Sequence, residues 1–261
     1  MTDADEDALL AVALEAARGA GAELRARFGH RQDGVRAKSG PTDLVSDADL
    51  AAEAAIRDVL KARRPDDAIL AEEGGATAGG ALRWVVDPLD GTINFLFGNP
   101  TWGVSVACED ADGGLVGVVL DPMRDECFAA TRSGPPTLDG EPIHGRAQGD
   151  LANALVATGF SYDAAVRARQ AAVVTRVLPR VRDIRRMGAA ALDLCWTACG
   201  RYDAFYERGL KAWDLAAGAL IAERAGLELR ALAETEHEPS GVVVARAGLM
   251  GELLELVRGG A

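Results

Sequence analysis

Residues 84–95 read WVVDPLDGTINF, and this stretch decides what the surrounding chain has to build. Its first three residues are apolar, as is typical of a buried strand, and Asp87 and Asp90 follow at the carboxyl end. Because Pro88 fixes φ and turns the chain, the two carboxylates can converge instead of alternating to opposite faces. Their mutual repulsion requires a cation, and closely spaced oxygen ligands favour Mg²⁺.

The same residues are also typical of a structural turn. Whether they form a turn alone or a metal site therefore depends on other carboxylates in the chain. Glu72 follows a β-like run that begins at Ala68, and Asp214 lies where a helix begins, a common place for a helix cap. All four carboxylates thus fall at strand or helix ends, which favours a shared site. Gly91 and Thr92 open a new helix, and free N–H groups at a helix start bind phosphate oxygens.

Upstream and downstream patterns predict two regions of different architecture. Residues 5–28 and 51–63 have helical spacing, and Ser46 or Asp47 caps the second helix. The β-like runs that follow are joined by turns and predict a largely antiparallel sheet, at 68–70, 84–86, 102–108, 115–120 and 126–130.

From residue 150 onward, strands and helices alternate, which predicts an α/β region. The expected strands are 155–157, 182–186, 202–206, 227–229 and 242–245, and the expected helices are 164–178, 189–199, 212–225 and 249–257. We therefore expect an N-terminal α+β region over residues 1–145 and a C-terminal α/β region over residues 146–261, packed as a layered sandwich with the site between them.

Composition excludes several classes of function. The 261 residues contain 28 Lys plus Arg against 40 Asp plus Glu, and the net charge of −12 disfavours nucleic acid as the main partner. No apolar run approaches the roughly 18 residues of a membrane span. The acidic N-terminus lacks the order of a signal peptide, and the four cysteines lack disulfide-framework spacing. We expect a cytoplasmic protein whose cysteines are core residues.

Several motifs, in this order, resemble the inositol monophosphatase family of Mg²⁺-dependent, Li⁺-sensitive sugar phosphatases. They are DLVSDAD at 43–49, EE at 72–73, DPLDGTINF at 87–95 and WDLAAG at 213–218. ATGF at 157–160 and RRMGAAALDL at 185–194 resemble the bacterial branch, and the matches span about residues 38 to 226. The resemblance implies an αβαβα layered sandwich, a homodimer and a small phosphorylated polyol or sugar-like substrate.

The resemblance also implies the metal ligands. Glu72, Asp87 and the backbone carbonyl of Leu89 would hold one Mg²⁺ ion, while Asp87, Asp90 and Asp214 would hold a second. Glu72 would also contact a weaker third ion. Two such ions clamp the attacking and leaving oxygens of a phosphoryl displacement, so no histidine or cysteine nucleophile is required.

The remaining roles follow from the same resemblance. Thr92, paired with Asp49, would orient the attacking water, so these two and Glu72 form the expected catalytic set. The amides of Gly91 and Thr92 would cradle the phosphate beside Asp90, and Glu207 would accept a substrate hydroxyl. Three further residues would line the substrate pocket, namely Gly188, Ala189 and Ala190.

Some alternatives stay open on the sequence. Ala189 stands where the family commonly has Ser or Thr, which leaves the substrate open among inositol 1-phosphate, histidinol phosphate, fructose 1,6-bisphosphate and nucleotide 3′-phosphates. A role as a binding partner of the transcription antitermination machinery is an alternative of another class, although the intact carboxylate set argues against a purely non-catalytic role. Arg185 and Arg186 would meet a second substrate charge or form structural ion pairs.

Overall fold

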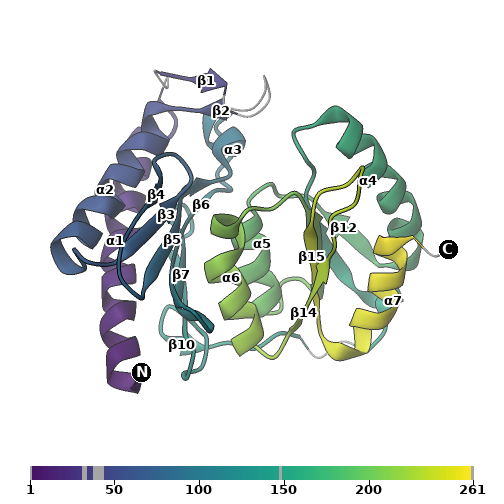
Figure 1. Cartoon of the computed structure of the whole chain (residues 1–261). Helices are drawn as coiled ribbons and strands as arrows, with labels where there is room; N and C mark the ends of the chain where they lie inside the picture. Colours follow the sequence, from purple (N-terminus) through teal and green to yellow (C-terminus); the bar gives the residue numbers. More distant parts are fainter. Residues whose placement is uncertain (1, 31–33, 38–43, 147–148, 260–261) are drawn as a thin grey trace.

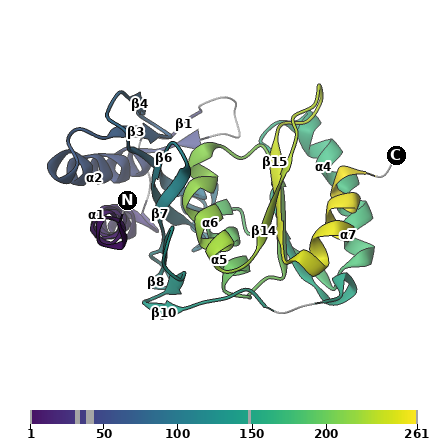
Figure 2. The same ribbon diagram turned by 60° about the horizontal axis from the view of Figure 1, so that its bottom comes forward.

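Helices and sheets stack in five layers in the order αβαβα, which confirms the predicted layered sandwich (Figure 1). The structure is a computed structural model that describes residues 2–30, 34–37, 44–146 and 149–259. Asp43, the first residue of the 43–49 motif, lies outside the described residues. Viewed from below, α5 and α6 lie between the two sheets, with α1 and α2 on one outer side and α4 and α7 on the other (Figure 2).

The first layer consists of α1 (Asp3–Arg27) and α2 (Asp47–Arg63), which pack on each other and on the first sheet. Each begins at a hydroxyl cap, Thr2 and Ser46, whose side chain accepts a hydrogen bond from a backbone amide of the first helical turn. Their apolar faces bury Trp84 and Trp102, both fully inaccessible to solvent. This layer therefore fixes the outer face of the strand that carries Asp87 and Asp90.

The second layer is an eight-stranded sheet in the order β10-β9-β8-β7-β6-β5-β3-β4. All neighbouring strands are antiparallel except β3 and β5, so the predicted largely antiparallel sheet is confirmed. The strands are β3 (Ala68–Ala71), β4 (Gly75–Thr77), β5 (Arg83–Asp90), β6 (Gly103–Asp110), β7 (Gly113–Asp121), β8 (Glu126–Thr131), β9 (Thr137–Leu138) and β10 (Glu141–Pro142). A separate short ribbon pairs β1 (Arg36–Ala37) with β2 (Leu44–Val45). The sequence patterns missed β4, β9 and β10 of this sheet and both strands of the ribbon.

The central layer is formed by α5 (Ala190–Ala198) and α6 (Ala212–Arg224). Every residue of α5 is buried, because this layer lies between the two sheets and packs on both of them. Gly117 of β7 allows α6 to come close, since a Cβ atom there would lie 2.9 Å from the backbone of Ala217. The layer brings the starts of both helices next to the end of β5.

The second sheet has the order β12-β11-β13-β15-β14, with β11, β12 and β13 parallel and the other pairs antiparallel. Its strands are β11 (Leu155–Thr158), β12 (Asp183–Arg185), β13 (Ala204–Arg208), β14 (Glu228–Leu232) and β15 (Gly241–Ala245). The outer layer consists of α4 (Ala164–Val177) and α7 (Ala247–Arg258). Short 3₁₀ turns at Leu151–Asn153 and Leu178–Arg180 complete this half.

The predicted alternation of strands and helices after residue 150 is thus present. The division into regions 1–145 and 146–261 stays a prediction, and both sheets share the apolar layer around α5 and α6. None of the helices in the described part of the chain is long and apolar enough to cross a membrane. The cysteines are free, with Cys108 and Cys195 fully buried and Cys127 and Cys199 half-buried.

Candidate active site

Asp87 and Asp90 both lie at the carboxyl end of β5 and are almost inaccessible, at 2% and 8% exposure. The pairing of β5 with β6 is irregular between these two residues, which is the local break that Pro88 predicted. Asp87 Oδ1 accepts a hydrogen bond from the Leu89 amide at 3.0 Å. The turn therefore holds two buried carboxylates close together instead of on opposite faces of the sheet.

Gly91 turns the chain from β5 into the short helix α3 (Thr92–Leu96). Its φ of +93° lies in the left-handed region, and a Cβ atom would lie 3.0 Å from the Thr101 carbonyl oxygen. Only glycine fits such a conformation in so little space. The glycine thus places the start of α3 directly beside the carboxylates.

Thr92 and Asp49 meet behind this turn, as the resemblance implies. The Thr92 hydroxyl lies 2.9 Å from Asp49 Oδ1 and 3.1 Å from the Leu89 carbonyl oxygen. Asp49 is itself fixed by Ser46, whose amide and hydroxyl donate to its Oδ2 at 2.8 and 2.7 Å. The cap of α2 therefore orients the carboxylate that orients Thr92.

Glu72 is half-buried and follows β3 on the loop that leads into β4. The sequence analysis missed the residue that anchors this loop, Glu53 of α2. Glu53 is 4% exposed, and its Oε2 accepts hydrogen bonds from the amides of Glu73 and Gly74 at 2.9 and 3.1 Å. The signal was a charged residue one helical turn after Asp49 on the same face of α2.

Asp214 is the third residue of α6, and the residue that caps the helix is Lys211. The Lys211 amide donates to Asp214 Oδ2 at 2.7 Å, so one carboxylate oxygen satisfies the helix start and the other is left for a ligand. Ser105 of β6 donates to the Trp213 carbonyl at 3.2 Å and ties this helix start to the first sheet.

Asp90 is anchored to the other helix of the central layer. The Ala190 and Ala191 amides, at the start of α5, donate to its two oxygens at 3.2 and 2.7 Å. Ala189, directly before, is fully buried and does not line the cleft. Of the three residues expected to border the substrate, Gly188 and Ala190 thus line the cleft and Ala189 does not.

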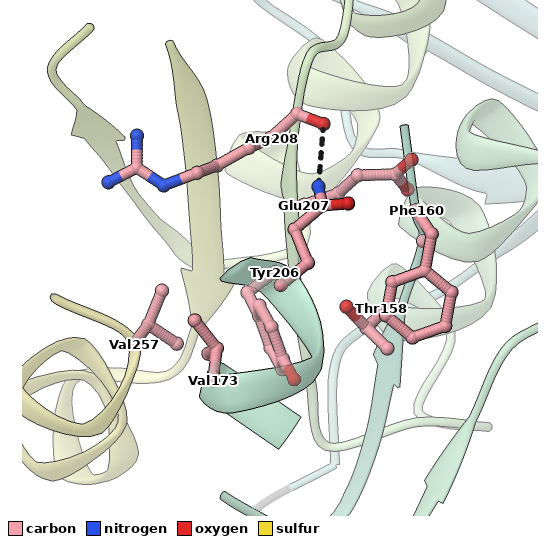
Figure 3. A pocket seen from close by; sticks show the side chains of 9 residues that line it. Thr158, Phe160, Val173, Tyr206, Glu207, Arg208 and Val257 are labelled. Atoms are coloured by element: carbon pink, nitrogen blue, oxygen red, sulfur yellow. Dashed lines mark hydrogen bonds between the residues drawn. The ribbon is translucent and has the colours of Figure 1, made fainter. Parts of the chain in front are cut away.

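Glu207 comes from β13 of the second sheet and is half-buried. Figure 3 shows its carboxylate beside Phe160, while the side chain of the next residue, Arg208, extends in the opposite direction, as expected for a strand. Gly159 makes room for it, because a Cβ atom there would lie 2.1 Å from the Glu207 carboxylate. The small pocket drawn in the figure extends from Glu207 toward α4 and α7.

One cleft of about 560 Å³ joins these positions. Every residue of the expected metal set lines it, and so do Gly91, Thr92, Gly188, Ala190 and Glu207. Asp49 reaches the site only through Thr92. The three histidines are exposed and none lines the cleft in the described part of the chain.

The carboxyl groups affect one another strongly. Burial, followed by the charges of Glu72, Asp90 and Asp214, raises the pKa of Asp87 well above its usual range. Burial and the Asp90 charge raise the pKa of Asp214 to about 7, although the Lys211 amide opposes the rise. Burial also raises the pKa of Asp90 to about 6 against the Ala190 and Ala191 amides.

This donor set fits a hard divalent cation. All its side chains offer oxygen atoms as ligands, and a positive ion between the carboxylates would relieve their mutual repulsion. Within the described residues, no three Asp, Glu, His or Cys side chains lie close enough together to coordinate one metal ion as they stand. Asp87, Asp90 and Asp214 each accept a hydrogen bond from a backbone amide, which fixes the orientation of their carboxyl groups.

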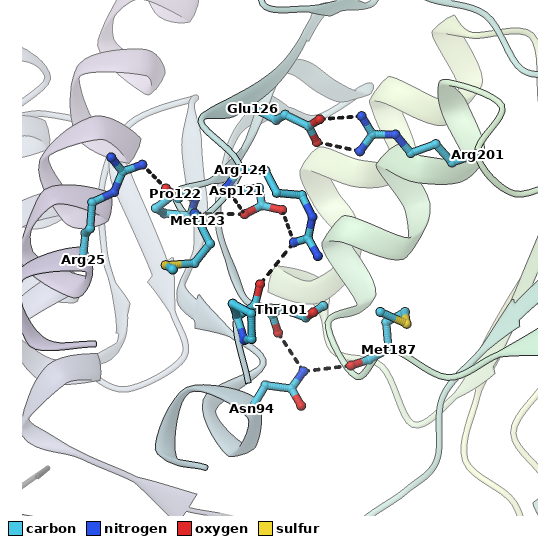
Figure 4. A network of polar contacts seen from close by, with 11 residues as sticks. Arg25, Asn94, Thr101, Asp121, Pro122, Met123, Arg124, Glu126, Met187 and Arg201 are labelled. Carbon is cyan, nitrogen blue, oxygen red and sulfur yellow. Dashed lines mark hydrogen bonds and ion pairs between the residues drawn. The ribbon is translucent and has the colours of Figure 1, made fainter. Parts of the chain in front are cut away.

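A polar network supports the cleft from the side of α3 (Figure 4). The Asn94 amide donates to the carbonyls of Thr101 and Met187 at 2.7 and 2.8 Å, which ties the first half of the chain to the loop before α5. Arg124 donates to Asp121 and to the Pro100 carbonyl at 2.8 and 3.1 Å. Asn94 belongs to the motif at 87–95, but the sequence did not indicate that its side chain joins these two segments.

Comparisons with known proteins identify the family of the chain. The sequence profile described as the inositol monophosphatase family matches residues 5–259. The chain is 43% identical to an inositol-1-monophosphatase of Mycobacterium bovis, over 94% of this chain and 89% of that protein. It is 39% identical to the Nus factor SuhB of Pasteurella multocida, over 84% and 83% of the two chains.

A solved structure has the same architecture throughout. The extragenic suppressor protein suhB of Bartonella henselae superposes with a TM-score of 0.89 at 32% identity, covering 97% of this chain and all of that one. The profile match, the curated relatives and the shared fold thus extend over nearly the whole chain. The protein therefore belongs to the inositol monophosphatase family, whose members are generally metal-dependent phosphatases that hydrolyse phosphate monoesters.

Proposed function

We propose that the protein is a Mg²⁺-dependent phosphatase that hydrolyses inositol 1-phosphate to inositol and phosphate. One observation carries this proposal. Glu72, Asp87, Asp90 and Asp214 line one cleft together with Glu207, a carboxyl group separate from the cluster that suits a substrate hydroxyl.

Five residues would hold the metal. Glu72, Asp87 and the Leu89 carbonyl would bind one Mg²⁺ ion, and Asp87, Asp90 and Asp214 would bind a second, with Glu72 also meeting a weaker third. When bound, such ions lower the pKa of water and neutralise the charge that develops on the phosphoryl oxygens. Burial and the neighbouring carboxyl charges, which together raise the pKa of Asp87 and Asp214, support this assignment.

Thr92 would orient the attacking water. Its hydroxyl carries one proton, which is directed to Asp49 Oδ1 or to the Leu89 carbonyl, so its lone pairs stay available to accept a hydrogen bond from water. The amides of Gly91 and Thr92 would bind phosphoryl oxygens at the start of α3. Asp49 acts through Thr92 and is therefore a positioning residue.

The leaving group would lie toward the second sheet. Glu207 would accept a hydrogen bond from one of its hydroxyls, and Gly188 and Ala190 would border it, because neither has a side chain large enough to block the cleft. Ala189 would contribute through its backbone, since its side chain is buried.

The test is phosphate release from inositol 1-phosphate, histidinol phosphate, fructose 1,6-bisphosphate and adenosine 3′,5′-bisphosphate, each with Mg²⁺ and with EDTA. We expect inositol 1-phosphate to have the highest kcat/KM and EDTA to abolish turnover. A different leading substrate would refute the substrate assignment, and turnover that persists in EDTA would refute the metal mechanism.

A second candidate function is a part in transcription antitermination, favoured by the similarity to relatives named Nus factor SuhB. An affinity purification from lysate that enriches no transcription protein would remove it. The expected homodimer is tested by sedimentation at micromolar concentration, where a monomer mass would contradict it. The cytoplasmic location and Li⁺ inhibition stay predictions.

A further inference from the structure

The two neighbouring arginines at the end of β12 have different surroundings. Arg185 forms an ion pair with Asp183 at 2.6 Å, and both side chains are about half exposed. Of the two roles that the sequence left open, Arg185 therefore has the structural one. Arg186 instead lines the cleft, with its guanidinium carbon 6.0 Å from the centre of the Phe160 ring. The alternation of side chains along an extended segment separates them.

Gly188 makes room for Arg186. A Cβ atom at Gly188 would lie 2.4 Å from Arg186 Nη1, and the φ of +84° also favours glycine there. Among the described residues, Arg186 has no hydrogen bond or ion pair. Its side chain therefore lines the cleft, and none of its N–H donors has a hydrogen-bond partner among the described residues.

The other cations of the cleft are placed differently. Arg208 is 8% exposed, donates to the carbonyls of Ala233 and Pro239 and lies 3.5 Å from Glu238. Lys211 lies at the metal end, where its amide bonds Asp214. Arg186 is thus the cation at the leaving-group end whose donors are available.

Glu207 and Arg186 are electrostatic neighbours. Burial, aided by the charges of Asp214 and Asp90, raises the pKa of Glu207 to about 8, and the Arg186 charge opposes that rise. Asp193 of α5, 1% exposed, has a pKa raised by burial and by Glu207, and Arg186 again opposes the rise. Neither Asp193 oxygen has a hydrogen-bond partner in the part of the chain described.

We propose that Arg186 contacts the substrate and sets its specificity, by donating a hydrogen bond to the hydroxyl next to the one that Glu207 accepts. An acceptor and a donor side by side select a leaving group with two neighbouring hydroxyls. A second phosphate in this place would instead lie close to the carboxyl groups of Glu207 and Asp193, whose ionised forms would repel it strongly away from water. This inference rests on the proposed function. It gives a role in substrate binding to Arg186, for which the sequence motifs left two roles open.

The experiment compares R186Q with the matched control R185Q, which removes the neighbouring arginine outside the cleft. Each is assayed with Mg²⁺ on inositol 1-phosphate and on 4-nitrophenyl phosphate, whose leaving group has no neighbouring hydroxyl. We expect R186Q to lower kcat/KM for inositol 1-phosphate by about tenfold to a hundredfold, mainly through KM, because a hydrogen bond to a charged group is lost. The loss with 4-nitrophenyl phosphate should be at least about tenfold smaller.

R186K should restore part of the lost kcat/KM, because lysine keeps the charge but not the planar fork of donors. R185Q should behave as the wild type. Equal losses on both substrates would overturn the inference, because they indicate a structural or purely electrostatic role, and so would an R186Q variant without loss. The variants are also assayed on fructose 1,6-bisphosphate, and a larger loss of kcat/KM on this substrate than on inositol 1-phosphate would overturn the inference in favour of an anion site. A wild-type protein that cleaves 4-nitrophenyl phosphate but not inositol 1-phosphate would refute the proposed substrate first.

Discussion

Replacing Asp214 with asparagine should stabilise the metal-free protein at pH 8 and abolish its Mg²⁺-dependent activity. The D214N side chain keeps an oxygen that can accept the hydrogen bond from the Lys211 amide, now 2.7 Å from Asp214 Oδ2. It loses the negative charge that lies among Asp87, Asp90 and Glu72. The variant therefore separates the effect of the carboxylate cluster on stability from its effect on activity.

The magnitude follows from the pKa. A folded-state pKa of about 7 against the ordinary 3.8 of aspartate corresponds to about 4 kcal/mol of unfavourable free energy for the ionised form. Because the cluster shares its protons, we expect about 1–4 kcal/mol in practice. The folded state retains a proton that the unfolded state has released between about pH 4 and pH 7, so the contribution of Asp214 to the wild-type stability falls as the pH rises through this window and is level above it.

Thermal unfolding in EDTA at pH 4 and pH 8 measures this effect. We expect equal stability of the two proteins at pH 4 and a higher Tm of D214N at pH 8, by about 2–4 °C for each kcal/mol. Added Mg²⁺ should then raise the Tm of the wild type more than that of D214N. A D214N protein that is less stable than the wild type at pH 8 in EDTA would refute the repulsive cluster.

Three further variants test other parts of the site. T92V should lower kcat by about a hundredfold with little change in KM, because the hydroxyl bonded to Asp49 is lost, and steady-state kinetics with an unchanged kcat would argue against the role of Thr92. E53Q should lower the free energy of unfolding by about 1–3 kcal/mol in urea titrations and raise the Mg²⁺ concentration for half-maximal activity, whereas an unaltered Mg²⁺ requirement would disconnect Glu53 from the metal site. G159A should displace Glu207, which a Cβ atom would approach to 2.1 Å, and raise the KM of inositol 1-phosphate more than that of 4-nitrophenyl phosphate; equal changes in the two KM values would contradict this.

The carboxylate cluster could be predicted because local rules act in the same direction there. An apolar run followed by Asp87, Pro88 and Asp90 determines a strand that ends in two converging acids, and the structure contains that irregular strand end. Long helices and strands with a clear period were predicted for the same reason. The two-residue strands, such as β9, contain too few residues for a period to be recognised.

Contacts between distant segments could not be predicted. Glu53 is a positioning residue only because the loop at Glu73, 20 residues later, folds onto α2. The different surroundings of Arg185 and Arg186 depend on Asp183 of β12 and on Phe160, which lies in the segment after β11. The burial of Ala189 likewise follows from the packing of α5 between two sheets.

A crystal structure of the protein soaked in Mn²⁺, with an anomalous difference map, tests the central claim most directly, because Mn²⁺ takes the oxygen ligands that suit Mg²⁺ and scatters anomalously. The account predicts at least two peaks in the cleft, bound by Glu72, Asp87, the Leu89 carbonyl, Asp90 and Asp214. A map without a peak among these carboxylates, from crystals soaked at a concentration that supports activity, would contradict it.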